Sequence, residues 1–164
     1  MSVSHTSPFN SALETGIRTL TVLVASFPRA HDLSRLVQYD YLVVHSEDAD
    51  GPPSLHPPLP LRTGELLVRR GLVEAGLRLL MSRNLASRSL GQDGVRYRAE
   101  EAAGAFIDNL TAPYLHELRQ RAEWVATTFD PLDDGDLNAL VKRFFSAWTT
   151  EFQPIDIGKQ EELF

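Results

Sequence analysis

The spacing of apolar residues predicts a first helix over residues 10–27. Its apolar face consists of residues about one helical turn apart: Leu13, Ile17, Leu20 and Val24. Ser11 and Glu14 have the spacing of a capping box, and Pro28 follows the end of the pattern. The segment therefore has both a start signal and a stop signal.

A second helix is predicted over residues 31–46, where Leu33, Leu36, Val37 and Val44 share a face. Asp40 falls inside this apolar face. A buried carboxylate costs several kcal/mol of desolvation unless it is paired. Asp40 is therefore either an acid with a raised pKa or one half of an ion pair with an arginine such as Arg18 or Arg62. The ion pair is favoured because charged groups in protein cores are normally paired.

The third predicted helix, residues 64–84, carries two apolar faces. One contains Leu66, Val73, Leu77 and Leu80, and the other contains Val68, Leu72, Ala75 and Leu79. A helix with two apolar sides is expected to lie between other elements of the core. Gly71 and Gly76 each cost about 1 kcal/mol relative to alanine, so they indicate a break or the close approach of another backbone.

Residues 85–99 change to a period of two, and Gly91 to Gly94 predicts the turn of a hairpin. In its second strand Val95 and Tyr97 point one way, whereas Arg96 and Arg98 point the other. Three helices followed by a hairpin is the order of a winged helix-turn-helix, with the hairpin as the wing. The predicted class is mainly α with a small β-hairpin wing, followed by a C-terminal helical pair.

Three further helices are predicted, over residues 100–110, 114–129 and 136–152, the last two forming an antiparallel pair. The final helix has an aromatic stripe, which is read either as core or as a partner-binding groove: Phe144, Phe145, Trp148 and Phe152. The predicted division is a domain at 8–110 with a proline-rich insertion at 47–61, the helical pair at 111–153 and a flexible tail at 154–164.

Charge is distributed unevenly along the chain. The chain as a whole carries a net charge of −6, whereas residues 62–98 hold eight arginines and three acidic residues, or +5, which leaves −11 for the remainder. This arginine-rich segment indicates either an anionic partner or pairing with the acidic remainder. The candidate DNA-binding residues are Arg78, Arg83, Arg88, Arg96 and Arg98. Few polar side chains are expected on the exposed face of the third helix, so base-specific reading is not favoured, while non-specific phosphate contact and docking on an acidic protein stay open.

The sequence contains no recognisable catalytic or metal-binding motif. It has no cysteine, and its five histidines lack ligand spacing. "HELRQ" has Gln120 where a zinc-protease helix needs its second histidine. "SEDADGPPSLHP" has Pro57 where a calcium loop needs a glutamate. A protein without enzymatic activity, cofactor or metal is therefore expected, in the cytoplasm and without a membrane span.

Four blocks of the sequence resemble one protein family: "PFNSALETGIR", "RLVQYDYLVVHS", "GPPSLHPPLPLRTGELLVRRGLVEAGLRLLMSR" and "RAEWV". They are similar to the middle component of bacterial ABC three-component systems, including the Lamassu-type ones, over about residues 8–130. The resemblance implies a small winged-helix-like protein. It also implies two protein partners: a coiled-coil ABC ATPase related to the SMC and Rad-fifty ATPases, and an effector, often a nuclease. Such systems are linked to defence against phage and plasmids, and the middle component is thought to bridge ATPase and effector.

The family offers no catalytic residues to transfer. The matching positions are candidates for an interface or a fold-defining network, and with the charged and aromatic residues noted above they give the candidate partner interface: Tyr39, Tyr41, His45, His56, Arg62, Arg69, Arg70, Phe145, Trp148 and Phe152. The proline stretch is read as a rigid insertion within one module, either a docking strip or a spacer. The alternative function is a dimeric winged-helix transcription regulator whose homodimer would use the aromatic C-terminal helices.

Overall fold

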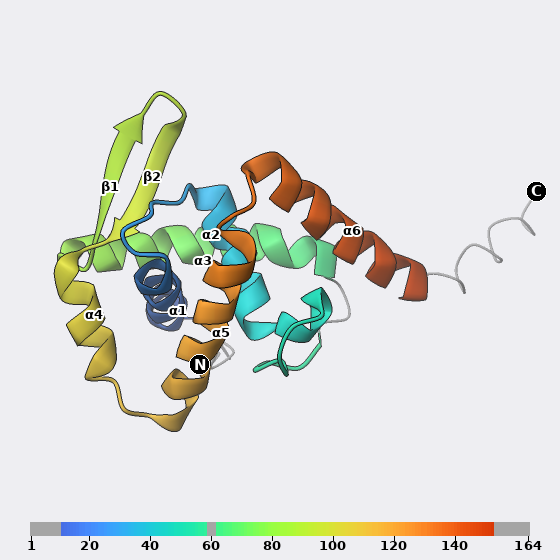
Figure 1. The fold of residues 1–164 in the computed structure, drawn as a ribbon, viewed down its shortest axis with the longest axis horizontal. Coiled ribbons are helices and arrows are strands. Elements are labelled where there is room, and N and C mark those ends of the chain that lie inside the picture. The colour runs from blue at the N-terminus through green and yellow to red at the C-terminus, as the bar shows by residue number, and fades with distance from the viewer. Residues whose placement is uncertain (1–10, 59–61, 153–164) are drawn as a thin grey trace, which may run out of the picture.

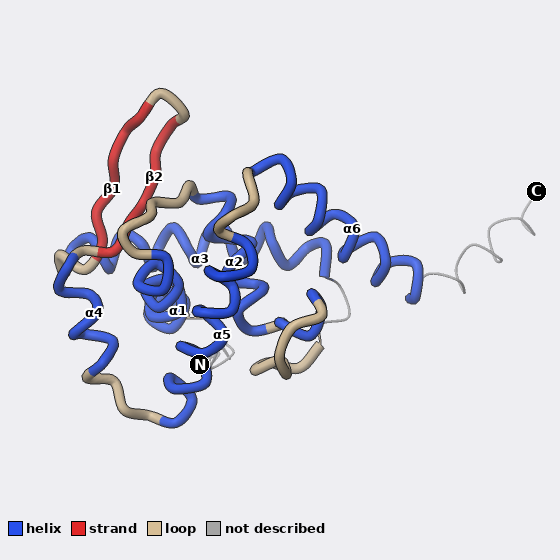
Figure 2. Tube along the Cα trace, viewed as in Figure 1, coloured by secondary structure: helices blue, strands red, loops and turns tan. Residues whose placement is uncertain are grey.

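The molecule is a helical body with a projecting β-hairpin, shown in Figures 1 and 2. The computed structural model describes residues 11–58 and 62–152, except the side chains of residues 62–65 and 146–152. Its elements are α1 (Ala12–Ser26), α2 (Leu33–Val44), the 3-10 helix η1 (Ser46–Ala49), α3 (Arg62–Ser82), β1 (Ala86–Gly91), β2 (Gly94–Ala99), α4 (Glu101–Asp108), α5 (Pro113–Phe129) and α6 (Asp134–Phe152). The expected fold class, mainly helical with a small hairpin, is confirmed.

One hydrophobic core joins the helices. It takes Leu20 and Leu23 from α1, Leu36 and Val43 from α2, Val73 and Leu77 from α3, and Leu118, Val125 and Phe129 from α5. Each such side chain contributes about 1.5–3 kcal/mol by leaving water. Helix α5 shares this core with α1 to α3. The predicted boundary at residue 110 therefore does not lie between two separate hydrophobic cores.

Helices α1 and α3 pack closely where two glycines face one another. A Cβ atom on Gly76 would lie 2.8 Å from the Cα and the N of Gly16, which is too close for any side chain. The expectation of close backbone packing is therefore confirmed for Gly76. At Gly71 neither alternative holds among the described residues, because α3 is unbroken there and a Cβ atom would meet nothing within 4 Å.

Two apolar positions predicted to be internal are exposed. Leu13 on α1 is 59% exposed and Val68 on α3 is 60% exposed. The first apolar face of α3 does enter the core through Val73, Leu77 and Leu80. The prediction that a second face is also covered is wrong at Val68, whereas Leu72, Ala75 and Leu79 on that face are partly buried.

The end of α3 directs the chain into the hairpin. Asn84 adopts a left-handed φ of 57°, and the amides of Asn84 and Leu85 donate to the carbonyls of Met81 and Leu80, which is the pattern of a Schellman motif. The strands then pair antiparallel from Ala86 opposite Ala99 to Gly91 opposite Gly94, as the turn signal predicted.

The connection between α1 and α2 pairs with the hairpin through one isolated β-bridge. His31 and Tyr97 exchange two backbone hydrogen bonds of 2.8 Å, so this connection lies along the free edge of β2. The base of the wing is therefore fixed to the helical body at a point far from it in sequence.

Helices α5 and α6 form consecutive helices, but α6 diverges from α5 in Figure 1 instead of running antiparallel along it. It contacts both α2 and α3. Toward α2, Gln38 donates to the Oδ1 atom of Asn138 at 2.7 Å, and the rings of Tyr41 and Phe145 lie 5.5 Å apart. The antiparallel packing expected from the short connection is wrong. The predicted flexible tail at 154–164 lies outside the described residues.

The described part of the proline-rich insertion is fastened to the body. The Ser46 hydroxyl donates to the carbonyl of Pro52, and Arg121 of α5 donates twice to the carbonyl of Pro53, at 3.0 and 2.8 Å. A Cβ atom on Gly51 would lie 2.3 Å from the ring of Trp124. These contacts fit a rigid insertion within one module.

Candidate functional site

A buried ion-pair cluster connects the first three helices. The Nε atom of Arg18 donates to Oδ1 of Asp40 at 2.9 Å, and the Nη1 atom of Arg69 donates to Oδ2 at 2.6 Å. All three side chains are at most 3% exposed. Burial alone would raise the pKa of Asp40, but the two guanidinium groups outweigh that effect and hold the pKa below its ordinary value. The ion-pair interpretation of Asp40 is confirmed, and the raised-pKa interpretation is wrong.

Arg69, the second arginine of the cluster, has a different role from the one predicted from the sequence. Arg69 was predicted as part of an exposed interface, whereas its guanidinium is buried against Asp40 and lies over the ring of Tyr41, 5.3 Å from the centroid. The side chain of Arg62, another predicted interface arginine, lies outside the described residues. The missed signal was spacing: Arg69 lies four residues before Val73, on the apolar face that enters the core.

Four other predicted interface residues are buried inside the fold, three of them beside this cluster and Tyr39 in a separate network with Asp130. Tyr39, Tyr41, His45 and His56 are all less than 9% exposed. The Tyr41 hydroxyl donates to Asp48 at 2.6 Å. These residues therefore belong to fold-defining networks, and the interpretation as an accessible surface does not fit their burial.

His56 links the proline-rich insertion to this cluster. Its Nε2 atom lies 2.9 Å from the hydroxyl of Tyr114 on α5. Burial lowers the pKa of His56, and the positive charges of Arg18 and Arg69 lower it further. The negative charge of Asp40 acts in the opposite direction but is outweighed, so the pKa falls from 6.5 to about 4. The ring is therefore neutral in the folded protein near pH 7.

Stability is expected to fall as the pH is lowered from 6.5 to 4. In this window the unfolded chain binds a proton at His56 that the folded chain does not, so the free energy of unfolding decreases as the pH falls. One such group contributes a slope of at most about 1.4 kcal/mol per pH unit. His56→Gln should flatten the curve by this amount, as measured by urea denaturation at half-unit pH steps. The control is His116→Gln at an exposed position, and an equal slope in wild type and His56→Gln would contradict the assignment.

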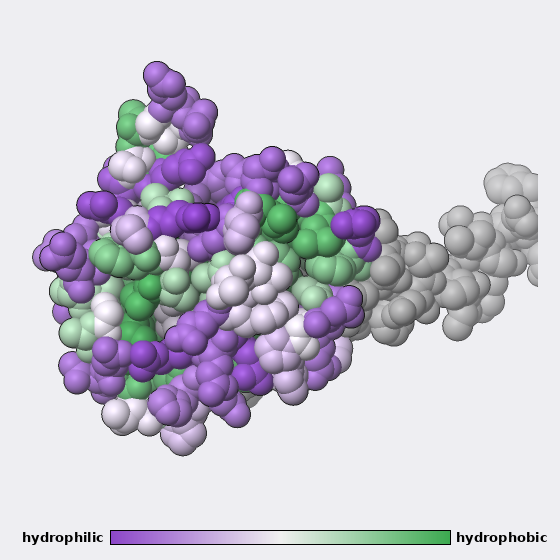
Figure 3. All heavy atoms as spheres, viewed as in Figure 1, coloured by the Kyte–Doolittle hydropathy of each residue, from purple (hydrophilic) through white to green (hydrophobic). Residues whose placement is uncertain are grey.

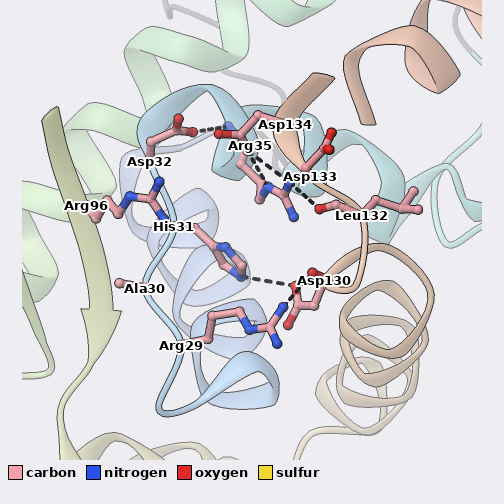
Figure 4. Close-up of a pocket in the computed structure, with 10 residues that line it drawn as sticks. All are labelled: Arg29, Ala30, His31, Asp32, Arg35, Arg96, Asp130, Leu132, Asp133 and Asp134. Atoms are coloured by element: carbon pink, nitrogen blue, oxygen red, sulfur yellow. Dashed lines mark hydrogen bonds and ion pairs between the residues drawn. The ribbon is translucent and has the colours of Figure 1, made fainter. Parts of the chain in front are cut away.

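A second polar network lies at the junction of α2, α5 and α6, shown in Figure 4. Arg35 donates to Asp134 and to the backbone carbonyls of Leu132 and Phe129. The Tyr39 hydroxyl donates to Asp130 at 2.8 Å, and burial raises the pKa of Tyr39. This network fixes the turn between α5 and α6.

A cleft of about 270 Å³ opens beside this network, and Arg96 of β2 lines it together with Arg29, His31 and Asp130. Figure 4 shows His31 directed at Asp130, and their side chains lie 3.1 Å apart. Opposite charges alternate around the cleft. The Nε2 atom of His31 also lies 3.0 Å from the buried hydroxyl of Ser26, and no single charge dominates the lining. Arg96, predicted to face DNA, instead lines this cleft at the base of the wing.

The other predicted DNA-binding arginines lie on the surface, but they do not share one face of the hairpin. Arg78, Arg83, Arg88 and Arg98 are exposed. Arg88 lies opposite Tyr97 in the register, whereas Arg98 lies opposite Ser87, so the two arginines project from opposite faces. Figure 3 shows hydrophilic residues over most of the hairpin.

The exposed surface of α3 combines apolar and basic residues. Leu67 is 79% exposed and Val68 is 60% exposed, Arg70 is exposed three residues after Leu67, and Arg78 is exposed about three turns after Leu67. Large apolar side chains grouped on a surface are typical of interaction sites. Of the remaining predicted interface residues, Phe145 packs against Tyr41, and the side chains of Trp148 and Phe152 lie outside the described residues.

Two further properties of the described part of the chain bear on its class. No helix in residues 11–58 and 62–152 combines the length and apolar character needed to cross a bilayer. In the same ranges no group of three or more histidine and acidic side chains is placed to hold a metal ion. The geometry is that of a small helical module with internal ion pairs and an exposed arginine-flanked helix.

Comparison with known proteins identifies the family of the chain. The family model for the ABC-three component (ABC-3C) system Middle Component 2 matches residues 8–151. The chain belongs to this family and is a component of an ABC three-component system. No curated protein and no solved structure gave a significant match.

Proposed function

We propose that this chain is a non-catalytic adaptor subunit. It bridges a coiled-coil ABC ATPase and an effector protein, such as a nuclease, in a cytoplasmic complex that defends against phage or plasmids. The observation that carries the proposal is the exposed surface of α3, which presents the apolar side chains of Leu67 and Val68 together with the exposed arginines Arg70 and Arg78 of the same helix. The family membership supports a role among protein partners.

The test is co-purification with the ATPase and the effector encoded beside the chain. The wild-type protein should elute with both from a size-exclusion column, and the double variant Arg70→Glu, Arg78→Glu should lose at least one partner, because a reversed charge repels a surface that had attracted it. Lys142→Glu, Arg143→Glu on α6 is the matched control with the same change in net charge. Recovery of the wild-type chain only as a free species, with both partners present, would remove the proposal.

Arg69 should not be used in this test. Its side chain is buried against Asp40, so Arg69→Glu would place two carboxylates together inside the core and unfold the protein. Loss of binding in that variant would report on folding and not on an interface.

A second candidate function, a dimeric winged-helix DNA-binding regulator, is favoured by the order of elements. Three helices precede the hairpin, as in winged helix-turn-helix domains, and His31, between the first two helices, forms one isolated β-bridge with it. It predicts discrimination of at least tenfold between duplex sequences in fluorescence anisotropy. Equal affinity for all duplexes that disappears near 0.2 M salt would leave only phosphate contact.

A further inference from the structure

The exposed face of α3 contains a glycine that the described fold does not require. Glycine is the least favourable residue in a helix interior after proline. At Gly76 the close approach of Gly16 explains it. At Gly71 a Cβ atom would meet nothing within 4 Å, so packing within the described part of the chain gives no reason for it.

The surroundings of Gly71 indicate that a glycine is needed there for packing against another molecule. Leu67 and Val68 lie four and three residues before it, on the same side of the helix, and both are exposed. The missing side chain at Gly71 therefore leaves a shallow notch next to two apolar side chains. This is the same combination that lets α1 and α3 cross closely at Gly16 and Gly76.

The charges beside the notch indicate the chemistry of the occupant. Arg70 is half exposed, with only a 4.0 Å contact to Glu74, and Arg78 is exposed one turn beyond Glu74. A partner that covers the apolar pair would bring its own flanks against these guanidinium groups. Acidic flanks would be attracted, and basic flanks would be repelled.

We infer that Gly71 is the crossing point for a helix of a protein partner, an amphipathic helix with small and aliphatic residues in its centre and acidic residues along its edges. This inference rests on the proposed adaptor function, because the partner subunit supplies the helix. Duplex DNA fits the site less well, since Leu67, Val68 and Gly71 offer no side-chain donors or acceptors to base edges.

The test compares substitutions with opposite effects on folding and on binding. Gly71→Ala should raise the melting temperature of the free chain and yet weaken binding of the purified ATPase subunit several-fold. Gly71→Leu should weaken that binding at least tenfold while the chain stays folded. The control is Gly104→Leu on α4, where a Cβ atom also meets nothing within 4 Å but residues one turn away are Glu100, Glu101, Ile107 and Asp108.

Isothermal titration calorimetry on the full chain measures the affinities, and a benzophenone side chain at position 68 reports the contact. A crosslink to a helical segment of the ATPase subunit supports the inference. Binding of Gly71→Leu within twofold of wild type overturns it and leaves the adaptor function standing. A crosslink to duplex DNA or to a second copy of the chain also overturns it. Failure of the wild-type chain to bind either neighbouring subunit overturns both proposals.

Discussion

Asp40→Asn is expected to lower the free energy of unfolding by about 3–5 kcal/mol, because removing one partner of a buried ion pair leaves charge uncompensated in the core. The Asp40 carboxylate receives both Arg18 and Arg69 and is fully buried between them. Asparagine keeps the shape but carries no negative charge. Two guanidinium groups would then lie close together without the carboxylate that joins them.

Urea denaturation followed by circular dichroism measures this loss. Asp108→Asn is the matched control: Asp108 also forms an ion pair, at 2.7 Å to Arg119, but it is mostly exposed to solvent. A surface pair contributes about 0–1 kcal/mol, so this variant should unfold almost as the wild type does. Equal, small losses in both variants would show that the buried cluster does not hold α1, α2 and α3 together.

Gly76→Leu is expected to cost about 3 kcal/mol or more, because inserting bulk into a packed core forces the backbone to move. The atoms that a Cβ would strike belong to the backbone of Gly16, which cannot rotate away as a side chain can. Helices α1 and α3 would have to separate, and the core between them would loosen.

Gly71→Leu, five residues earlier on the same helix, is the control for this change. A side chain there has open space, and leucine is a better helix former than glycine by nearly 1 kcal/mol. The two variants should therefore shift the melting temperature in opposite directions. A similar loss in both would indicate that α3 as a whole resists large residues, and the explanation by the Gly16 contact would then be wrong.

Local signals in the sequence determined most of the secondary structure. The Ser11 cap was predicted from its spacing to Glu14, and the Ser11 side chain does accept from the Glu14 amide at 3.1 Å. The turn between Gly91 and Gly94 and the helix–helix–helix–hairpin order were also read correctly, because caps, turns and periodicity depend on residues a few positions apart. The same local pattern placed Asp40 inside an apolar face and predicted an arginine partner, such as Arg18 or Arg62, without deciding between them.

Contacts between distant segments could not be read in this way. Nothing in the sequence near Arg69 states that Asp40, 29 residues earlier, lies 2.6 Å away, so the residue was taken for part of a surface. The path of α6 was predicted from loop length, but α6 makes contacts with α2 and α3, such as Gln38 to Asn138, which loop length does not reveal.

What the sequence by itself determined is the set of helices, the hairpin, the need to pair a buried acid and the resemblance to a middle component. Only the tertiary structure decided which arginines are internal, which face of α3 stays uncovered and which glycine has a neighbour. The physical reason is that burial is a property of the whole packing arrangement: Gly71 and Gly76 are the same residue on the same helix, and only the position of α1 makes them different.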